Sequence, residues 1–208
     1  MTEPVKLYLV RHGQTDLNRD RRFRGLSDAP LNDEGKYEAA GAARMLAGAG
    51  LSNIYTSPVR RAAETATAIA VTTGARVETE EDFTDIDYGD WQGLTVEEVA
   101  ERFGPEELES WRRDPTSFRF PGGDSMQSVR ERLEPALLRA VTDGHEGHLA
   151  VVSHLAVLKV CFVVLMGLDM GYFWRIGLDN GSVSLFTHTP AGGFTLERWN
   201  EPPMGTHP

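Results

Sequence analysis

The chain has 208 residues, of which 40% are hydrophobic and 25% charged, and its net charge is −10. This length suits one globular domain with a substantial core, and the acidic charge argues against nucleic acid as a partner, because a phosphate backbone is bound by a basic surface. The apolar run VCFVVLM is too short to span a bilayer, and the N-terminal segment lacks the long apolar region of a signal peptide. We therefore expect a cytoplasmic protein without a membrane partner. Residues 1–200 are expected to form a single domain, and residues 201–208 a disordered tail.

Strand and helix signals alternate along the chain. Short apolar runs bounded by Pro or Gly predict strands, and apolar residues at helical spacing after an N-cap residue predict helices. In chain order, the expected strands span residues 5–10, 54–56, 76–79, 149–153, 182–187 and 194–199. The expected helices span residues 32–50, 58–74, 95–104, 125–141 and 155–168. This order predicts an α/β three-layer sandwich, in which helices flank a mainly parallel central sheet with a C-terminal β-hairpin.

Local signals set the expected starts of three helices. Pro58 is expected in the first turn of its helix, where a missing N–H is tolerated. Thr95 and Glu98 have the spacing of a capping box. Asp124 and Gln127 have the same spacing and predict a similar start for the helix over residues 125–141.

Two of the buried-strand signals end on a histidine. The first apolar run continues into Arg11-His12-Gly13, and the run LAVVSH ends on His154. Functional groups gather at the carboxyl ends of parallel strands, so the two histidines predict an active site. The Arg11 guanidinium is expected to lower the pKa of the neighbouring imidazole, which leaves His12 unprotonated and nucleophilic near pH 7. Gly13 is expected to allow a close approach of backbone and ligand.

The segment SPVRRAAETA places arginines at the start of an expected helix. Helix N-termini favour anions, and an arginine there adds a forked donor for phosphate oxygens. Two arginines, two histidines and a helix N-terminus therefore predict a dianion site around a nucleophile, which suits phosphoryl transfer. The single cysteine, Cys161, lies in an apolar run and is expected to be a small buried hydrophobe.

Seven sequence blocks cover nearly the whole chain in the order of a known family. They read RHGQTDLN, RFRGLSDAPLNDEG, SPVRRAAETA, DIDYGDWQG, FPGGDS, VVSH and DNGSV. With these blocks the chain resembles the histidine phosphatase superfamily, in its phosphoglycerate-mutase-like branch. RHG alone would be a weak signal, whereas seven ordered blocks are specific.

The resemblance implies a role for each matching residue. His12 would be the nucleophile that takes up the phosphoryl group as phosphohistidine. The residues that hold the phosphate would be Arg11, Arg61, His154 and, as a neutral donor, Asn18. Arg61 is preferred to Arg60, because the family pattern Arg-Ala-x-Gln/Glu-Thr-Ala matches residues 61–66. Arg60 is then expected to be a solvated helix charge.

The general acid is expected in DIDYGDWQG, where the resemblance points to Asp85 in the position of a family Glu. A carboxyl group near the phosphate should have a raised pKa and could protonate the leaving oxygen. Asp87 is the alternative, and its other expected role is to order the loop. Trp91 is expected to pack this loop. His12, His154 and Asp85 could form a metal site, but two arginines in the same site would repel a divalent cation, so neither a metal nor another cofactor is expected.

Two positions depart from the family pattern. Leu155 follows His154 where relatives carry Gly, so either the helix start tolerates a side chain or the pocket is narrower and more apolar. Arg24 stands where Gln is common, and either contacts an anionic substrate or is a surface charge.

The leading function hypothesis is a metal-independent phosphomonoesterase for small anionic metabolites. A cofactor-dependent phosphoglycerate mutase is the first alternative, but its family members have longer chains and a different acid-loop block. A non-catalytic phospho-ligand-binding protein is the second, but such a protein would be expected to lack His12 or an arginine. The choice of substrate depends on loops such as residues 111–120. The sequence does not distinguish a monomer from a homodimer.

Overall fold

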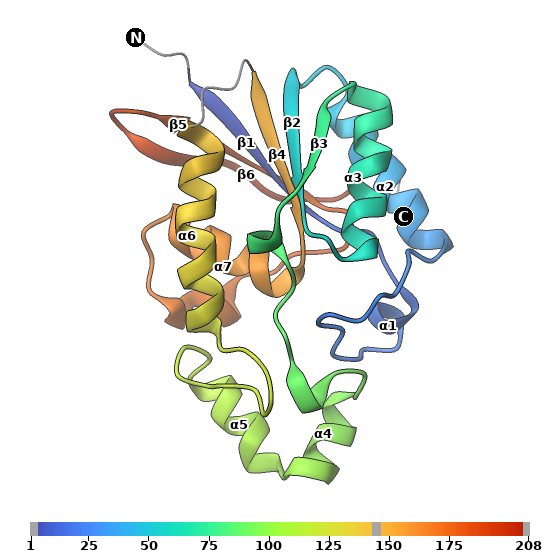
Figure 1. The fold of residues 1–208 in the computed structure, drawn as a ribbon, viewed down its shortest axis with the longest axis vertical. Coiled ribbons are helices and arrows are strands. Elements are labelled where there is room, and N and C mark those ends of the chain that lie inside the picture. The colour runs from blue at the N-terminus through green and yellow to red at the C-terminus, as the bar shows by residue number, and fades with distance from the viewer. Residues whose placement is uncertain (1–3, 143–146, 206–208) are drawn as a thin grey trace.

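A six-stranded sheet crosses the centre of the molecule, and helices cover both of its faces (Figure 1). The structure is a computed structural model that describes residues 4–142 and 147–205. Its strands are β1 (Val5–Arg11), β2 (Leu51–Thr56), β3 (Arg76–Thr79), β4 (His148–Ser153), β5 (Val183–Thr189) and β6 (Gly193–Glu201). They lie in the order β3-β2-β4-β1-β5-β6; the first four are parallel, and β5 and β6 form an antiparallel hairpin. The predicted α/β fold is confirmed.

The longer helices form three pairs. On one face of the sheet α2 (Asp33–Leu46) packs with α3 (Arg60–Thr73), and on the other α6 (Met126–Thr142) packs with α7 (Leu155–Leu165). The third pair, α4 (Val96–Phe103) and α5 (Pro105–Arg113), lies beyond one end of the sheet (Figure 1). A single turn, α1 (Asp16–Arg19), follows the loop after β1.

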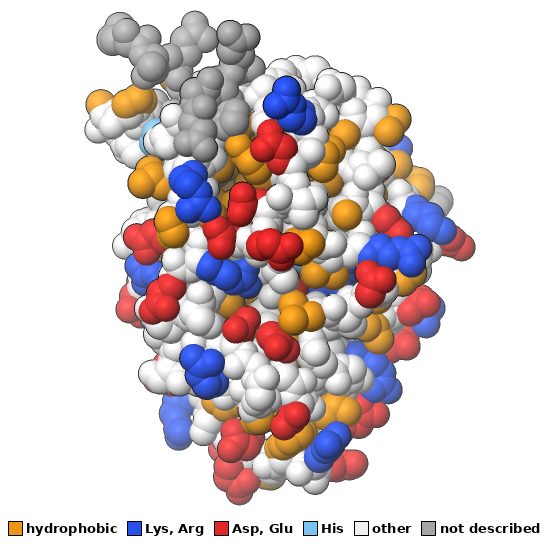
Figure 2. Space-filling model, viewed as in Figure 1, with side chains coloured by type: hydrophobic (Ala, Val, Ile, Leu, Met, Phe, Trp, Pro, Cys, Tyr) orange, Lys and Arg blue, Asp and Glu red, His pale blue; other side chains and the backbone are white. Residues whose placement is uncertain are grey.

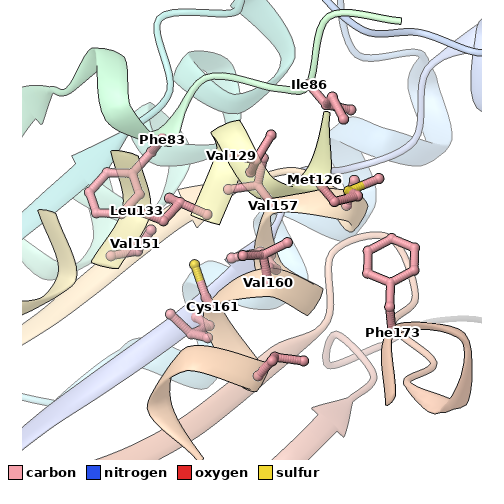
Figure 3. Close-up of a cluster of buried hydrophobic side chains, with 14 of the residues drawn as sticks. Phe83, Ile86, Met126, Val129, Leu133, Val151, Val157, Val160, Cys161 and Phe173 are labelled. Atoms are coloured by element: carbon pink, nitrogen blue, oxygen red, sulfur yellow. The ribbon is translucent and has the colours of Figure 1, made fainter. Parts of the chain in front are cut away.

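Alternation along β1 divides the core into two layers. Leu7 and Leu9 belong to the apolar cluster beneath α6 and α7, whereas Tyr8 and Val10 belong to the cluster beneath α2 and α3. Figure 3 shows the first cluster, where α6 and α7 face each other through Met126, Val129, Leu133, Val157, Val160 and Cys161. Cys161 is buried, as expected, and burial raises the pKa of its thiol to about 12.

Helix α3 begins later than expected. Pro58 was predicted in its first turn, but the first helical residue is Arg60. Val59 has an extended backbone and precedes the helix, and its N–H donates to Ser57 Oγ at 3.2 Å. The helix therefore starts directly on the two arginines, Arg60 and Arg61.

Helix α6 is capped by a different pair of residues from the pair predicted. Ser128 N donates to Ser125 Oγ, and Ser125 N donates to Ser128 Oγ, each at 3.1 Å. Asp124 does not cap the helix, because its carboxylate accepts the N–H of Asp87 at 3.1 Å. Gln127 instead bonds Glu131 one turn later. Ser125 and Ser128 have the same spacing one residue further on, so spacing alone could not choose between the two pairs.

Two helices were missed from the sequence. The expected loop over residues 111–120 begins inside α5, which ends at Arg113. The available signal was Pro105 in the first turn of the helix, directly after Gly104. In α1, Thr15 and Asn18 form a capping box that encloses only one turn.

The chain beyond residue 200 is placed against the domain as far as it is described. Glu201 ends β6, Pro203 is buried, and Met204 O accepts a hydrogen bond from Arg44 on α2. Residues in the span 201–205 thus contact the rest of the fold, and residues 206–208 lie outside the described part. A single domain over residues 1–200 stays a prediction.

The surface carries both signs of charge. Figure 2 shows Asp and Glu side chains interspersed with Lys and Arg over one face of the molecule. In the described part of the chain, no helix has the length and apolar character needed to cross a bilayer.

Candidate active site

The predicted site residues meet at the carboxyl ends of β1, β2 and β4. β1 lies beside β4 with Arg11 opposite Ser153, and His12 N donates to Ser153 O at 3.0 Å. β2 lies on the other side of β4 and leads through Ser57 into α3. Parallel pairing therefore carries His12, His154 and the start of α3 to one edge of the sheet.

The Arg61 guanidinium lies at the centre of the site. Its side chain is wholly buried, and its Nε lies 3.2 Å from both His12 Nε2 and His154 Nδ1. Its Nη2 donates to Asp85 Oδ2 at 2.7 Å. These contacts bring together four of the residues predicted to be catalytic, and they favour Arg61 over its neighbour Arg60. Arg60 pairs instead with Glu64 at the surface, as expected for a solvated charge.

Hydrogen bonds define the tautomer of His12. Its Nδ1 lies 2.7 Å from Gly13 O, and a carbonyl can only accept, so Nδ1 carries the proton. Nε2 then accepts from Arg61 and keeps its lone pair. Burial holds the pKa of His12 well below its usual range, and Arg61 and Arg11 add to this effect. Arg11 acts in the predicted direction, but burial is the larger cause.

His154 is held from both ring nitrogens. Because Nδ1 accepts from Arg61, the neutral ring carries its proton on Nε2, which donates to Ser57 Oγ at 2.8 Å. Burial and Arg61 also hold the pKa of His154 well below its usual range. Ser57 was missed from the sequence, and its place in the SPVRRAAETA block was the available signal.

Asp85 is the carboxylate that reaches the site. Its Oδ2 is bound to Arg61 and lies 3.5 Å from His154 Nδ1, while its Oδ1 accepts the N–H of Ile86 at 2.9 Å. Burial raises the pKa of Asp85, although the positive charges of Arg61 and Arg24 oppose this effect.

Asp87 orders its own loop. Its Oδ1 accepts the N–H of Gly89 at 2.8 Å, and its carbonyl oxygen accepts from Asp124 N. Trp91, which is wholly buried, packs this loop as expected. The rings around Trp91 are Phe23, Phe103, Trp111, Phe118 and Phe120. The geometry therefore favours Asp85 over Asp87 as the residue near a bound phosphate.

Three buried polar atoms near the site find no hydrogen-bond partner among the residues that the structure describes: Arg11 Nε, Arg24 Nε and Ser27 Oγ. Arg11 uses Nη1 on Leu178 O at 2.6 Å, and Arg24 uses Nη1 on Arg22 O at 3.1 Å. An unsatisfied buried polar group costs about 1–3 kcal/mol. Buried guanidinium donors of this kind are typical of an anion site, and a contact of Arg24 with a substrate stays a prediction.

The loop after β1 closes over Arg61. Gly25 O accepts from Arg61 Nη2 at 2.7 Å, and Ser27 O accepts from Nη1 at 2.9 Å. His12 and Arg61 are both fully buried under this loop. Together with Asp85 and the two histidines, these carbonyl oxygens occupy most of the N–H donors of Arg61.

Asn18 lies in α1, and Leu155 is the first residue of α7. Asn18 Oδ1 accepts from Thr15 N at 3.0 Å, which leaves its Nδ2 as the donor for a ligand. Leu155 begins α7 directly after His154 and is partly buried against the apolar core. Contacts of Asn18 and Leu155 with a substrate stay predictions.

Gly13 allows two backbone segments to touch, and the expected close approach of a ligand stays a prediction. A Cβ at Gly13 would lie 2.2 Å from Gly35 O, and one at Gly35 would lie 2.0 Å from Gln14 O. Thr65, which the sequence did not single out, links the same loop to α3, because its Oγ1 accepts from Gly13 N and donates to Arg61 O.

We expect Gly13→Ala to lower the free energy of unfolding by about 1–3 kcal/mol, because the added methyl group overpacks this contact. Urea unfolding measures the change. Gly177→Ala is the control, since a Cβ at Gly177 would meet no atom within 4 Å. Equal losses in the two variants would contradict the tight contact at Gly13.

Over residues 4–142 and 147–205, no group of three or more His, Cys, Asp or Glu side chains could hold a metal ion.

Comparison with known proteins points to one family. The family model described as "Histidine phosphatase superfamily (branch 1)" matches residues 7–202. The chain is 37% identical over 182 residues to phosphoserine phosphatase 1 of Hydrogenobacter thermophilus, a match that covers 87% of this chain and 85% of that protein. It is 30% identical over 184 residues to a "Probable phosphoglycerate mutase" of Salmonella paratyphi B, covering 86% and 83% of the two chains.

A longer relative and a solved structure extend this similarity. The chain spans only 54% of a bifunctional protein of Mycobacterium tuberculosis, to which it is 36% identical over 200 residues, or 95% of this chain. The structure of a mycobacterial glucosyl-3-phosphoglycerate phosphatase with VO3 matches with a TM-score of 0.85 and 28% identity, over 94% of this chain and 98% of that one.

Proposed function

The chain belongs to branch 1 of the histidine phosphatase superfamily, and from its site we propose that it hydrolyses small phosphate monoesters through a phosphohistidine, without a metal ion. One observation carries the proposal: the neutral His12 presents an unprotonated Nε2 to the Arg61 guanidinium. A nucleophile and a phosphate-binding group are thereby placed in contact. The relatives include proteins named as phosphoserine and glucosyl-3-phosphoglycerate phosphatases, and these names support small phosphate monoesters as substrates.

In the first step His12 Nε2 attacks phosphorus and the bond to the leaving oxygen breaks. The three guanidinium groups of Arg11, Arg24 and Arg61 offset the charge on the phosphoryl oxygens. A bound dianion also raises the pKa of His154 and favours a proton on its Nδ1, which turns this nitrogen from an acceptor into a donor. His154 then completes the phosphate site.

Asp85 serves both steps of the proposed reaction. When phosphate draws the Arg61 guanidinium toward itself, Asp85 loses part of its counter-charge and its pKa rises further. The protonated carboxyl group gives its proton to the leaving alkoxide in the first step. In the second step the carboxylate accepts a proton from water, the water oxygen bonds to phosphorus, and the bond from phosphorus to His12 breaks.

A phosphoglycerate mutase is the alternative, supported by the 30% identical relative that bears this name. It would share the phosphohistidine and differ in passing the phosphoryl group back to the substrate. A binding protein without turnover is less favoured, because the chain retains His12, Arg11, Arg61 and His154 in one site. A cytoplasmic location and a monomeric or homodimeric state stay predictions.

The proposal is tested by measuring phosphate release from p-nitrophenyl phosphate, glycerol 3-phosphate, phosphoserine and 3-phosphoglycerate in the presence of EDTA. We expect release from at least one of these esters that EDTA does not reduce. Conversion of 3-phosphoglycerate to 2-phosphoglycerate with 2,3-bisphosphoglycerate, and no phosphate release, would replace the proposal by the mutase. Release that EDTA abolishes would contradict the metal-independent mechanism.

A further inference from the structure

Lys159 is a buried cation that the proposed reaction does not use. It is the single charged residue of α7 and is only 8% exposed. Its Nζ lies 4.8 Å from the centre of the Phe173 ring and 5.6 Å from that of Trp174. Within the described residues, no Asp or Glu oxygen lies within 4.0 Å of this ammonium group. Charged groups in protein interiors are normally paired with an opposite charge, whereas Lys159 has two aromatic rings beside its ammonium group.

The charged group that acts on Lys159 has the same sign. Burial lowers the pKa of Lys159 to about 8, and the positive charge of Arg11 adds to this effect. The amine is therefore still mostly protonated at neutral pH. In the described part of the chain, carboxylates act on Arg11 but none acts on Lys159, so an anion that binds beside Lys159 would stabilise its charge.

Lys159 lies on the side of the site formed by α7 and the segment that follows it. It comes one helical turn after Leu155, on the same face of α7. The 3-10 helix Met170–Arg175 supplies its two aromatic rings, and Arg11 is bound to Leu178 O just beyond that helix. The side chains of Lys159 and Arg11 therefore both contact the segment over residues 173–178.

Aromatic rings continue from Lys159 toward the other side of the site. Trp174 packs edge-on against Trp111, with ring centres 4.7 Å apart, and Trp111 packs against Phe23 at 5.6 Å. Phe23 precedes Arg24, whose Nε lacks a partner. Packed aromatic rings therefore extend from Lys159 to the segment that carries Arg24.

On the basis of the proposed function, we propose that Lys159 binds a carboxylate of the substrate while Arg11 and Arg61 hold its phosphate. A lone ammonium group set among aromatic rings matches a carboxylate, whereas a second phosphate would call for several charge-assisted donors. Lys159 then selects phosphate esters of small carboxylic acids over esters of uncharged alcohols. It is a specificity-determining residue and takes no part in the bond-breaking steps.

The test compares 3-phosphoglycerate with glycerol 3-phosphate, which carries a hydroxymethyl group in place of the carboxylate. Lys159→Met keeps an unbranched side chain and removes the charge. We expect it to lower kcat/KM for 3-phosphoglycerate by at least about tenfold, and that for glycerol 3-phosphate by less than about twofold. Lys159→Arg, which keeps the charge, should retain most of the preference for 3-phosphoglycerate.

Other outcomes separate this proposal from the proposed function. Equal losses on the two esters, or a wild-type enzyme that does not prefer 3-phosphoglycerate, would overturn the role of Lys159 and leave the phosphatase intact. If the wild type hydrolyses no ester, the phosphatase proposal fails, and calorimetric binding of the same two compounds decides the role of Lys159. Tighter binding of 3-phosphoglycerate that Lys159→Met removes supports it, and equal affinities overturn it. If circular dichroism shows that Lys159→Met does not fold, Lys159→Gln replaces it in both assays.

Discussion

Replacing His12 with glutamine is expected to lower kcat for phosphate release by at least about 10⁴-fold, because loss of a covalent nucleophile removes the reaction path itself. Glutamine has polar atoms of similar reach, but its amide nitrogen has no lone pair for attack on phosphorus. The Arg61 guanidinium stays in place, so substrate binding should weaken much less than turnover. Steady-state phosphate release, with KM measured alongside kcat, separates these two effects.

A second measurement on His12 tests the covalent intermediate directly. Brief incubation with a 32P-labelled ester and quenching in alkali should leave acid-labile label on the wild-type protein and none on His12→Gln. His188→Gln is the matched control, because His188 is opposite Val5, at the other end of β1 from the site. The nucleophile assignment would be lost if His12→Gln kept wild-type turnover, or if the label remained on that variant.

The pH dependence of this nucleophile follows from its environment. A histidine whose pKa is lowered stays unprotonated as the pH falls through the usual range of the residue. His12 should therefore not limit turnover between about pH 6 and pH 7, where an exposed histidine would begin to take up a proton. The same shift makes stability depend on pH. His12 and His154 stay neutral in the folded chain, so stability falls as the pH drops below the pKa they have when unfolded.

The positions of His12 and His154 could be predicted from the sequence, because the prediction needs only the location of two strands and their parallel arrangement. Each histidine ends an apolar run, and parallel strands bring such ends to one edge of a sheet. Direct pairing of β1 with β4 confirms this placement. Arginines at the start of α3 could also be expected, because a helix N-terminus favours anions. The choice of Arg61 over Arg60, and the choice of Asp85, depended on the family resemblance, since no strand pattern marks these residues.

The choice between neighbouring residues depended on geometry that spacing does not contain. Asp85 and Asp87 are two positions apart and chemically identical, yet one binds Arg61 and the other binds Gly89 N. The backbone of this loop, packed by Trp91, decides which carboxylate enters the site. Lys159 was not predicted for a related reason. A single lysine in an apolar helix gives no sequence signal of a binding role, and its burial is seen only in the structure.

Asp85→Asn should reveal the general acid through its dependence on the leaving group. Asparagine keeps the size of the side chain but has no acidic proton to give. We expect kcat/KM for glycerol 3-phosphate to fall by about 10²–10⁴-fold, since an alkoxide leaves poorly without a proton. The loss with p-nitrophenyl phosphate should be much smaller, because p-nitrophenolate leaves as a stable anion. Rates on the two esters, measured under identical conditions, give this ratio.

The pH dependence of the rate provides a second test of Asp85 as the general acid. Asp85 must be protonated to act as an acid, and burial raises its pKa above the ordinary value, so the active form persists to higher pH than for an exposed aspartate. In the wild type, glycerol 3-phosphate cleavage should therefore fall as the pH rises through this raised pKa, and Asp85→Asn should lack that descending limb. Asp87→Asn is the control, because Asp87 orders the same loop without touching Arg61. A loss in Asp85→Asn that is equal for both esters, or a leaving-group-dependent loss in Asp87→Asn, would move the acid away from Asp85.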